Sequence, residues 1–294
     1  MKILLTGASG QVGWELARTL APLGTVWAPS RTEFDLQQPH TLAAAVRAWQ
    51  PDIMINPAAW TAVDLAESES AAAWEINCAA PTALAAVAAE LNIPLIHFST
   101  DYVFNGQQTR PWSEADRPDP LGVYGASKLA GEQALLKSGA ACLIFRTTWV
   151  YGRRGKNFLL TMLRLAAERE ELRVVADQFG APTWSRQLAQ ATALVVMGLR
   201  QKEGALVEAV RSVAGIYHLS AGGETSWHGF AEAIIHATAS QRAHPLRVVP
   251  IATTDYPLPA ARPAYSVLNN DKFANTFGLR LPLWRESLYQ CLAD

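Results

Sequence analysis

Short apolar runs alternate with longer alanine-rich or amphipathic stretches over the first 150 residues of the chain. Each run has the length of one strand and is bounded by polar or turn-forming residues, as expected for strands buried on both faces. The runs lie at 25–28, 52–56, 95–99 and 142–146. The stretches that we expect to be helices lie at 42–49, 71–91 and 124–137. This alternation predicts a parallel sheet with helices on both sides.

The rhythm changes after residue 151, where helical patterns are separated by glycine and proline. The elements expected there are a strand at 172–175, helices at 157–170, 187–200, 226–239 and 283–292, and a proline-punctuated segment at 245–263. We therefore predict an α/β chain in which residues 1–150 form the sheet domain. Residues 151–294 are expected to form mainly a smaller, interleaved lobe, with some segments returning to the first domain.

The chain begins with a glycine-rich turn between an apolar strand and a helix, MKILLTGASGQVGWELA. In a dinucleotide-binding turn, Gly7 would allow the tight bend, Gly10 would let backbone N–H groups approach a pyrophosphate, and Gly13 would bring helix and strand together. Glycines at this spacing also occur in ordinary turns. Because an apolar strand precedes them and an amphipathic stretch at 14–20 follows, we interpret the turn as a cofactor site in a Rossmann-type, doubly wound sheet.

Composition excludes several classes of function. Half of the 294 residues are hydrophobic, which is enough for a large core with a smaller lobe. The formal net charge is -1 and no run of Lys or Arg occurs, so we expect no binding to nucleic acid or to a membrane. The cysteines Cys78, Cys142 and Cys291 form no CxxC pair, and the N-terminal apolar run is too short for a signal peptide. A cytoplasmic protein acting on small molecules is expected.

Tyr124 and Lys128 are the strongest candidates for catalysis. They are four residues apart in a predicted helix, so their side chains lie one turn apart on the same face. The pKa of a free tyrosine is about 10, and a neighbouring ammonium would lower it by stabilising the phenolate. We expect Tyr124 to act as a general acid or base.

A second polar group, Ser99, Thr100 and Asp101, ends the apolar strand in HFSTDYVF. The carboxyl ends of parallel strands face the crevice in which ligands bind, so the Thr100 hydroxyl could reach the carbonyl oxygen that Tyr124 protonates. Alone, the tyrosine and lysine fit a surface helix pair and the second group fits a helix cap. Their order behind a glycine-rich turn favours a catalytic site.

These three motifs, in this order, resemble those of the extended short-chain dehydrogenase/reductase family. Within it, the segments NPAAWTAVDLAE, STDYVFNG, YGASKLAGE, FRTTWVYG, DQFGAPT and ARPAYSVLN are similar to those of the dTDP-4-dehydrorhamnose reductases. The resemblance implies NAD(P)H-dependent reduction of the ketone at carbon 4 of dTDP-4-dehydro-6-deoxy-L-mannose, the last step of dTDP-L-rhamnose synthesis.

The resemblance also implies roles for the candidate residues. Tyr124 would give its proton to the ketone oxygen, Lys128 would hold the nicotinamide ribose, and Thr100 would polarise the ketone. Trp149 would lie against the sugar with Asp101 nearby, although packing in the core is the alternative for a large aromatic side chain. The cofactor contacts carried over are Gly10, Gln11 and Val12 at the pyrophosphate, Asp35 and Leu36 near the adenine, and Ala59 and Thr61 along the nicotinamide side. Asp35 could instead cap the following helix.

The end of the second strand bears on the choice of coenzyme. A carboxylate there usually binds the ribose 2′-OH of NAD, whereas this chain has Ser30 and Arg31. A hydroxyl and a guanidinium suit a 2′-phosphate, so we expect NADPH to be preferred, with NADH open as a second coenzyme. In the lobe, Arg262 is a candidate partner for the substrate diphosphate, or it pairs with a carboxylate at the lobe boundary.

Some related activities and partners are less compatible with the residues present. Tyr102 occupies the place where the similar dehydratases carry an acidic residue, and the cysteines do not match those of the epimerase-reductases. Some relatives dimerise through magnesium held by two glutamates, but here only Glu15 is present and Arg186 takes the second place. We therefore expect no metal; a homodimer remains open, and His97 is expected to be a satisfied core residue. The alternatives are a non-catalytic NADP-binding regulatory subunit and a reductase of another dTDP-4-keto-6-deoxy sugar.

Overall fold

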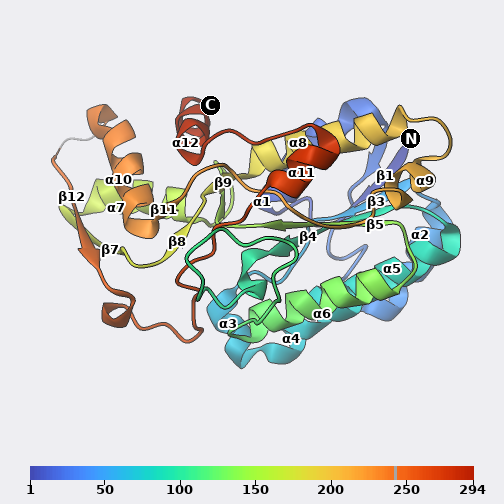
Figure 1. Cartoon of the computed structure of the whole chain (residues 1–294), viewed down its shortest axis with the longest axis horizontal. Coiled ribbons are helices and arrows are strands. Elements are labelled where there is room, and N and C mark those ends of the chain that lie inside the picture. The colour runs from blue at the N-terminus through green and yellow to red at the C-terminus, as the bar shows by residue number, and fades with distance from the viewer. Residues whose placement is uncertain (242–243) are drawn as a thin grey trace.

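The computed structural model describes residues 1–241 and 244–294, and a six-stranded parallel sheet lies at its centre (Figure 1). The strands, in spatial order, are β10 (Gly215–His218), β5 (Cys142–Thr147), β4 (Leu95–Thr100), β3 (Ile53–Asn56), β1 (Lys2–Leu5) and β2 (Thr25–Trp27). This arrangement confirms the predicted fold class, an α/β chain of the Rossmann type.

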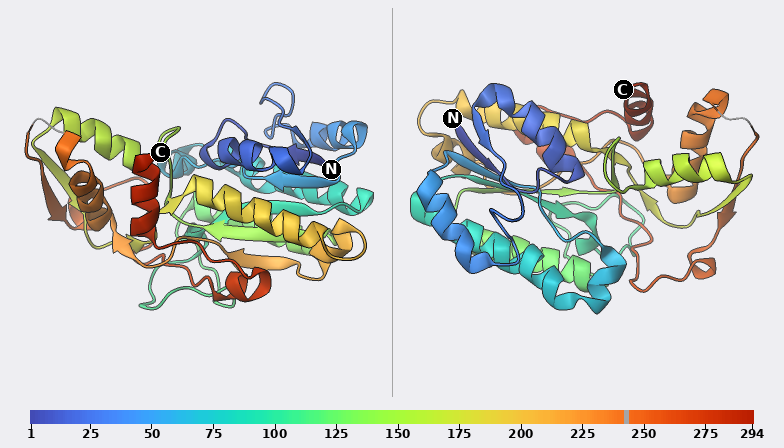
Figure 2. Two further views of the ribbon diagram at one scale, coloured as in Figure 1. Left: turned by 90° about the horizontal axis from the view of Figure 1, so that it is seen from above. Right: turned by 180° about the vertical axis from the view of Figure 1, so that it is seen from behind.

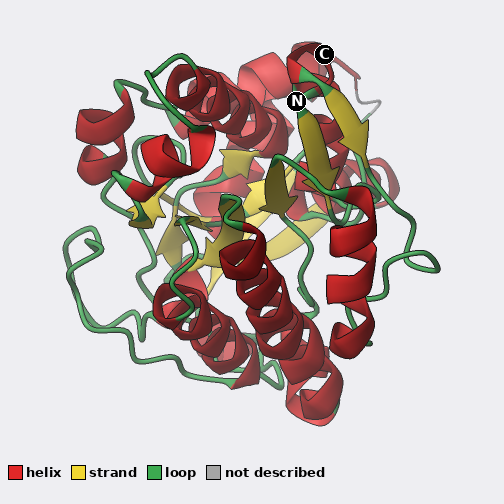
Figure 3. Ribbon diagram, turned by 90° about the vertical axis from the view of Figure 1, so that its right-hand side faces the viewer, coloured by secondary structure: helices red, strands yellow, loops and turns green. Residues whose placement is uncertain are grey.

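Helices cover both faces of this sheet, as an end-on view shows (Figure 3). One apolar core lies under α1 (Gln11–Thr19), α8 (Ser185–Arg200), α9 (Leu206–Arg211) and α11 (Asp271–Phe277). The other lies under α2 (Pro39–Trp49), α5 (Ala80–Leu91) and α6 (Val123–Lys137). The short helices α3 (Val63–Ser68) and α4 (Ser70–Trp74) contact α6.

A smaller lobe lies beyond one end of the sheet (Figure 2). It contains the parallel pair β7 (Glu171–Val175) and β12 (Arg247–Ile251) and the helices α7 (Phe158–Glu168), α10 (Trp227–Ala237) and α12 (Trp284–Ala293). The lobe has its own apolar core. Two short strand pairs lie between the central sheet and the lobe. They are β6 (Val150–Tyr151) with β9 (Thr183–Trp184), and β8 (Phe179–Gly180) with β11 (Thr225–Ser226).

Two sequence expectations are corrected by the structure. The strand expected at 25–28 is not fully buried: Thr25 of β2 is exposed and the next two residues are half-buried, and β2 is the edge strand of the sheet. The single helix expected at 71–91 is broken by a π-helical turn at Glu75–Ala79. Pro81 has no N–H for the carbonyl of Asn77, and that carbonyl lies where a side chain at Gly131 of α6 would stand, 2.2 Å from an ideal Cβ. Pro81 and the close approach of α6 account for the irregular turn.

The strand order places a topological switch point between β1 and β3. The chain passes from β1 to β2 on one side and then returns to pair β3 on the other side of β1. Ligands of open α/β sheets bind at the carboxyl ends of the strands at such a point. The fold thus places a binding crevice beside the glycine-rich turn.

Candidate active site

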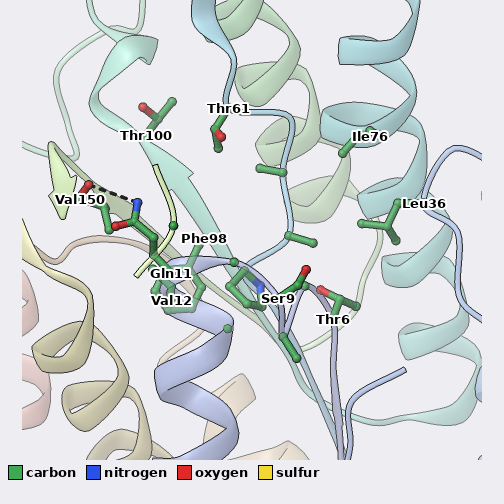
Figure 4. A pocket seen from close by; sticks show the side chains of 18 of the residues that line it. Thr6, Ser9, Gln11, Val12, Leu36, Thr61, Ile76, Phe98, Thr100 and Val150 are labelled. Atoms are coloured by element: carbon green, nitrogen blue, oxygen red, sulfur yellow. Dashed lines mark hydrogen bonds between the residues drawn. The ribbon is translucent and has the colours of Figure 1, made fainter. Parts of the chain in front are cut away.

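A cavity of about 1120 Å³ lies at the carboxyl ends of the central strands (Figure 4). Its walls come from the segments after β1, β2, β3, β4 and β5, from the start of α6, and from Trp227 of the lobe. The predicted residues that line it are Gly7, Gly10, Gln11, Val12, Gly13, Ser30, Arg31, Asp35, Leu36, Ala59, Thr61, Thr100, Asp101, Tyr124, Lys128 and Trp149. The structure thus brings together residues that are far apart in the sequence.

The glycine-rich turn is tight enough to exclude side chains. Gly7 has a φ of +60°, which favours glycine, and an ideal Cβ there would lie 2.8 Å from the Cβ of Ala58. At Gly13 a Cβ would lie 2.1 Å from the Gly7 carbonyl oxygen, so any larger residue would push α1 away from β1. The turn therefore brings the N-terminus of α1, whose first turn has no acidic residue, to the cavity.

Two buried hydroxyls fit a polar ligand. Ser99 Oγ and Thr147 Oγ1 lie on residues that line the cavity, and within the described part of the chain neither atom has a hydrogen-bond partner. Buried polar atoms are normally satisfied. Together with the glycine cradle, these free hydroxyls fit a polar ligand such as a dinucleotide, whose hydrogen-bonding groups would satisfy them.

Tyr124 is buried at the start of α6, next to Thr100 at the end of β4. Burial raises the pKa of the phenol to about 12, against the side-chain hydrogen bond with Thr100, which lowers it. The ring of Tyr102 packs edge-on against the Tyr124 ring at 5.4 Å. The phenol is therefore held in its protonated form at neutral pH.

Lys128 lies one turn further along α6 and is almost completely buried. Its Nζ donates to the Phe98 carbonyl oxygen at 2.6 Å and lies 3.1 Å from His97 Nε2. Burial lowers the pKa of the lysine to about 8. The expectation that Lys128 brings the pKa of Tyr124 below its usual value is therefore corrected, because burial raises this pKa and the opposing contribution comes from the Thr100 hydrogen bond.

Asp101 is a buried carboxyl rather than a free surface charge. Thr148 Oγ1 donates to its Oδ2 at 2.7 Å and Thr100 Oγ1 donates to its Oδ1 at 3.1 Å. Burial raises its pKa to about 6, although hydrogen bonds from Thr148, Ser266 and Thr100 oppose the rise. Thr148 was not predicted, although it directly precedes Trp149 in the quoted segment FRTTWVYG.

The end of β2 carries both a cation and a carboxylate. Arg31 is hydrogen-bonded to Gln37 and lies 3.6 Å from Asp35. Ser30 Oγ donates to Glu33 Oε2 at 2.7 Å, and Glu33 also lines the cavity. Glu33 was not predicted, because its place in the turn after Ser30 and Arg31 carries no signal of a coenzyme contact in the sequence. Asp35 accepts from Gln37 N in the turn before α2 and does not cap that helix.

Trp149 is stacked and also lines the cavity. Its indole lies parallel to that of Trp227, with ring centroids 3.5 Å apart and planes 6° apart. Its φ of +45° is unusual for a residue with a side chain, and a Cβ at Gly180 would lie 2.5 Å from the ring. No sequence signal pointed to Trp227, because its partner is 78 residues away and only the fold joins them.

Two arginines discussed from the sequence form ion pairs with carboxylates. Arg262 makes a bidentate pair with Asp64 at 2.9 and 2.7 Å, which is the carboxylate pairing given as one of the two alternatives for this residue. Arg186 pairs with Glu15 at 3.2 Å and with Asp294. Over residues 1–241 and 244–294, no group of three or more His, Cys, Asp or Glu side chains is gathered as a metal site would require. Nor does any helix within these ranges have the length and hydropathy to span a membrane.

Comparison with known proteins places the chain in a family. Residues 1–294 match the family described as the RmlD substrate binding domain. A dTDP-4-dehydrorhamnose reductase of Burkholderia thailandensis is 50% identical over 302 residues, covering 100% of this chain and 99% of the relative. The corresponding protein of Escherichia coli is 47% identical, covering 100% and 98%.

Solved structures of similar proteins indicate the same family. A dTDP-4-dehydrorhamnose reductase from Clostridium acetobutylicum has a TM-score of 0.90 at 35% identity, covering 100% of this chain and 99% of that one. One from Bacillus anthracis, in complex with NADP, has a TM-score of 0.88 at 34% identity, covering 99% and 98%. With the glycine-rich turn, the tyrosine and the lysine around one cavity, the chain belongs to the dTDP-4-dehydrorhamnose reductase family.

Proposed function

We propose that the protein reduces the ketone at carbon 4 of dTDP-4-dehydro-6-deoxy-L-mannose with NADPH, giving dTDP-L-rhamnose in the last step of dTDP-rhamnose synthesis. The observation that carries the proposal is the meeting of the glycine-rich turn, Thr100, Tyr124 and Lys128 around one cavity. Relatives named for this reaction, 50% and 47% identical over the whole chain, support it.

The chain's own residues account for the proton side of the reaction, while a bound nicotinamide coenzyme supplies the hydride. Because burial keeps the Tyr124 phenol protonated, it can donate to the ketone oxygen as negative charge develops there. Thr100 offers a second hydroxyl beside it. Lys128, when protonated, favours the phenolate that Tyr124 leaves behind.

The same cavity offers groups for each part of the coenzyme. The pyrophosphate would meet the backbone at Gly10, Gln11 and Val12, where the N-terminus of α1 favours an anion. Arg31 would pair with the 2′-phosphate of NADPH, and the NADP complex of the Bacillus anthracis relative supports this choice. The remaining contacts proposed are Asp35 and Leu36 at the adenine, Ala59 and Thr61 towards the nicotinamide, and Lys128 at its ribose.

The substrate sugar would lie between the tyrosine and the lobe. Trp149, with Trp227 stacked on it, forms an aromatic wall on that side. Asp101, close to Thr100, would face the sugar from the strand end. Lys156, an exposed cation that lines the cavity and that sequence reasoning missed, can approach a phosphate group. Arg262 is not proposed to bind the diphosphate, because Asp64 already holds its guanidinium.

The wider setting follows from charge and composition. We propose a cytoplasmic enzyme without nucleic-acid or membrane partners, since the net charge is -1 and no basic run occurs. The ion pair between Arg186 and Glu15 supports a protein without a magnesium bridge, because a guanidinium repels a metal ion. The division into a coenzyme domain of residues 1–150 and a mainly substrate-binding lobe of residues 151–294, from which some segments return to the coenzyme domain, is part of the same proposal.

The test is NADPH oxidation by the purified protein, with the keto sugar nucleotide generated in the assay. We expect turnover by the parent and a loss of about 10²- to 10⁴-fold in kcat for Tyr124→Phe, which keeps the ring and removes the hydroxyl that donates the proton. Tyr289→Phe is the control, because Tyr289 is exposed on α12. NADPH binding should survive in both variants.

Other outcomes would separate the alternatives. A parent that binds NADPH but turns over no dTDP-4-keto sugar would favour the regulatory subunit. Turnover of a different keto sugar alone would keep the reductase and change its substrate. Full activity in Tyr124→Phe would remove the tyrosine from the mechanism.

A further inference from the structure

A buried chain of polar side chains lies behind the catalytic lysine. Thr6 Oγ1 donates to Asn56 Oδ1 at 2.5 Å, Asn56 Nδ2 lies 3.0 Å from His97 Nδ1, and His97 Nε2 lies 3.1 Å from Lys128 Nζ. All four residues are less than 5% exposed. Burying this many polar groups is costly unless each has a hydrogen-bond partner, so these contacts constrain the orientation of all four side chains.

Neighbouring strands build this chain. Thr6 directly follows β1, whereas Asn56 and His97 are directly opposite each other in the register of β3 and β4. Thr6 and Lys128 both line the cavity, whereas the two residues between them lie within the protein. Figure 4 shows Thr6 beside Ser9 at the glycine-rich turn, away from Thr100. This row of hydrogen-bonded side chains therefore connects the glycine-rich turn to Lys128 through the sheet.

The hydrogen-bond directions along the chain are coupled. A neutral imidazole has one donor and one acceptor, and an ammonium can only donate. Burial, and then the charge of Lys128, hold the pKa of His97 well below its usual range, so the ring is neutral. A charged Lys128 therefore requires Nε2 to accept, which leaves the ring proton on Nδ1 and requires the Asn56 oxygen to face it.

The amide orientation described above, with Asn56 Nδ2 facing His97, fits an uncharged lysine. With Asn56 Nδ2 towards His97 Nδ1, the ring proton lies on Nε2 and points at an uncharged Lys128 amine. A half-turn of the Asn56 amide exchanges the two arrangements. The amide does not itself carry a proton, so this chain orients groups and does not conduct protons.

We propose that His97 is a positioning residue for Lys128, and that its tautomer, coupled to the orientation of the Asn56 amide that Thr6 contacts, sets whether the lysine carries its proton. The inference rests on the proposed function, in which Lys128 assists Tyr124. It gives a role to a histidine that the sequence identified only as a satisfied core residue. It also means that contacts made at Thr6, beside the coenzyme turn, reach the lysine.

The other charged groups near Lys128 are accounted for. Glu132 lies one turn further along α6 and favours the ammonium, but Arg146 of β5 holds its carboxylate in a bidentate pair. Tyr124 is protonated at neutral pH. His97 of β4 is therefore the neighbour whose hydrogen bonding can differ between the two lysine states.

The experiment compares substitutions that differ in hydrogen bonding but little in shape. Asn56→Asp places an acceptor at His97 Nδ1 and favours the ammonium, so the basic limb of the kcat/KM profile should move to higher pH. His97→Leu removes the acceptor and should move the limb to lower pH by about one unit or more, and His97→Gln should partly restore it. Thr6→Val should shift the limb less than either and weaken NADPH binding.

A second measurement does not depend on turnover. Nitrogen NMR of the histidine rings, with His97 identified by its loss in His97→Gln, reports which ring nitrogen carries the proton. We expect Nδ1 to be protonated in Asn56→Asp. An unchanged pH limb in His97→Leu and His97→Gln, or a tautomer that ignores Asn56→Asp, would overturn the proposal even if the protein is a reductase. If instead the parent lacks reductase activity, the NMR result still decides the coupling.

Discussion

At the scale of single residues, burial acts in opposite directions on the two groups of the catalytic pair. It raises the pKa of Tyr124 to about 12 and lowers that of Lys128 to about 8. The first shift keeps the proton on the donor, and the second makes the lysine charge sensitive to mildly basic pH. The sequence predicted that the two side chains are adjacent but not the sign of the tyrosine shift, because spacing contains no information on desolvation.

Coenzyme preference is also decided at single residues, at the end of β2. Arg31→Ala should lower kcat/KM for NADPH by about tenfold or more and leave that for NADH almost unchanged, because a charged hydrogen bond to the 2′-phosphate is lost. Steady-state kinetics with both coenzymes measure this. Arg47→Ala, in an exposed pair on α2, is the control. Equal losses in kcat/KM with the two coenzymes would mean that Arg31 does not bind the 2′-phosphate of NADPH.

At the scale of elements, α6 organises the site. Tyr124, Lys128 and Glu132 follow one another at intervals of four residues, so they form a single buried stripe along the helix. The last of them pairs with Arg146 of β5, both side chains being at most 2% exposed. One ion pair thus fixes the helix against the strand next to the one that carries Thr100.

Breaking the Glu132–Arg146 ion pair should destabilise the folded protein. Glu132→Gln leaves the Arg146 guanidinium buried without its counter-charge, which should lower the free energy of unfolding by about 3–5 kcal/mol. Urea denaturation measures it. Glu90→Gln breaks the exposed pair with Arg47 and should leave the midpoint almost unchanged. If the two variants unfold at the same urea concentration, the buried pair does not anchor α6.

The elements that carry Thr100, Tyr124 and Lys128 were predictable from periodicity. The strand expected at 95–99 is β4, Leu95–Thr100, and the helix expected at 124–137 is α6, Val123–Lys137. The strand β12 was missed, because the prolines of 245–263 suggested irregular chain, although Pro250 lies in a two-stranded pair. The contact between Trp149 and Trp227 could not be predicted, since nothing local in the sequence specifies a partner in another part of the fold.

At the scale of the whole molecule, buried titratable groups determine how stability depends on pH. His218 is buried, and its pKa is lowered to about 3 mainly by burial; the pKa of His97 is also well below its usual range. Both bind protons more readily in the unfolded chain, so acid favours unfolding. Asp101, with its pKa raised to about 6, acts in the opposite sense, but it is one group against two.

We therefore expect the free energy of unfolding to fall as the pH is lowered from 6.5 towards 4. The net slope should be on the order of 1 kcal/mol per pH unit, the difference between two histidines and one carboxyl. Urea denaturation at several pH values measures it, and Asp101→Asn should make the slope steeper by removing the opposing group. Stability that is constant or rises over this range would contradict the burial of neutral histidines.

The strand β10 has a consequence for dissecting the protein. It comes from the second half of the chain but closes the sheet beside β5, while α8 packs against α1. A fragment ending at residue 150 would expose the hydrogen-bonding edge of β5 and the apolar side of the sheet that α8 covers. Such a fragment should aggregate on expression, whereas a circular permutant that keeps every segment should stay in solution. Size-exclusion chromatography of the two would show that the coenzyme domain is completed only by the last part of the chain.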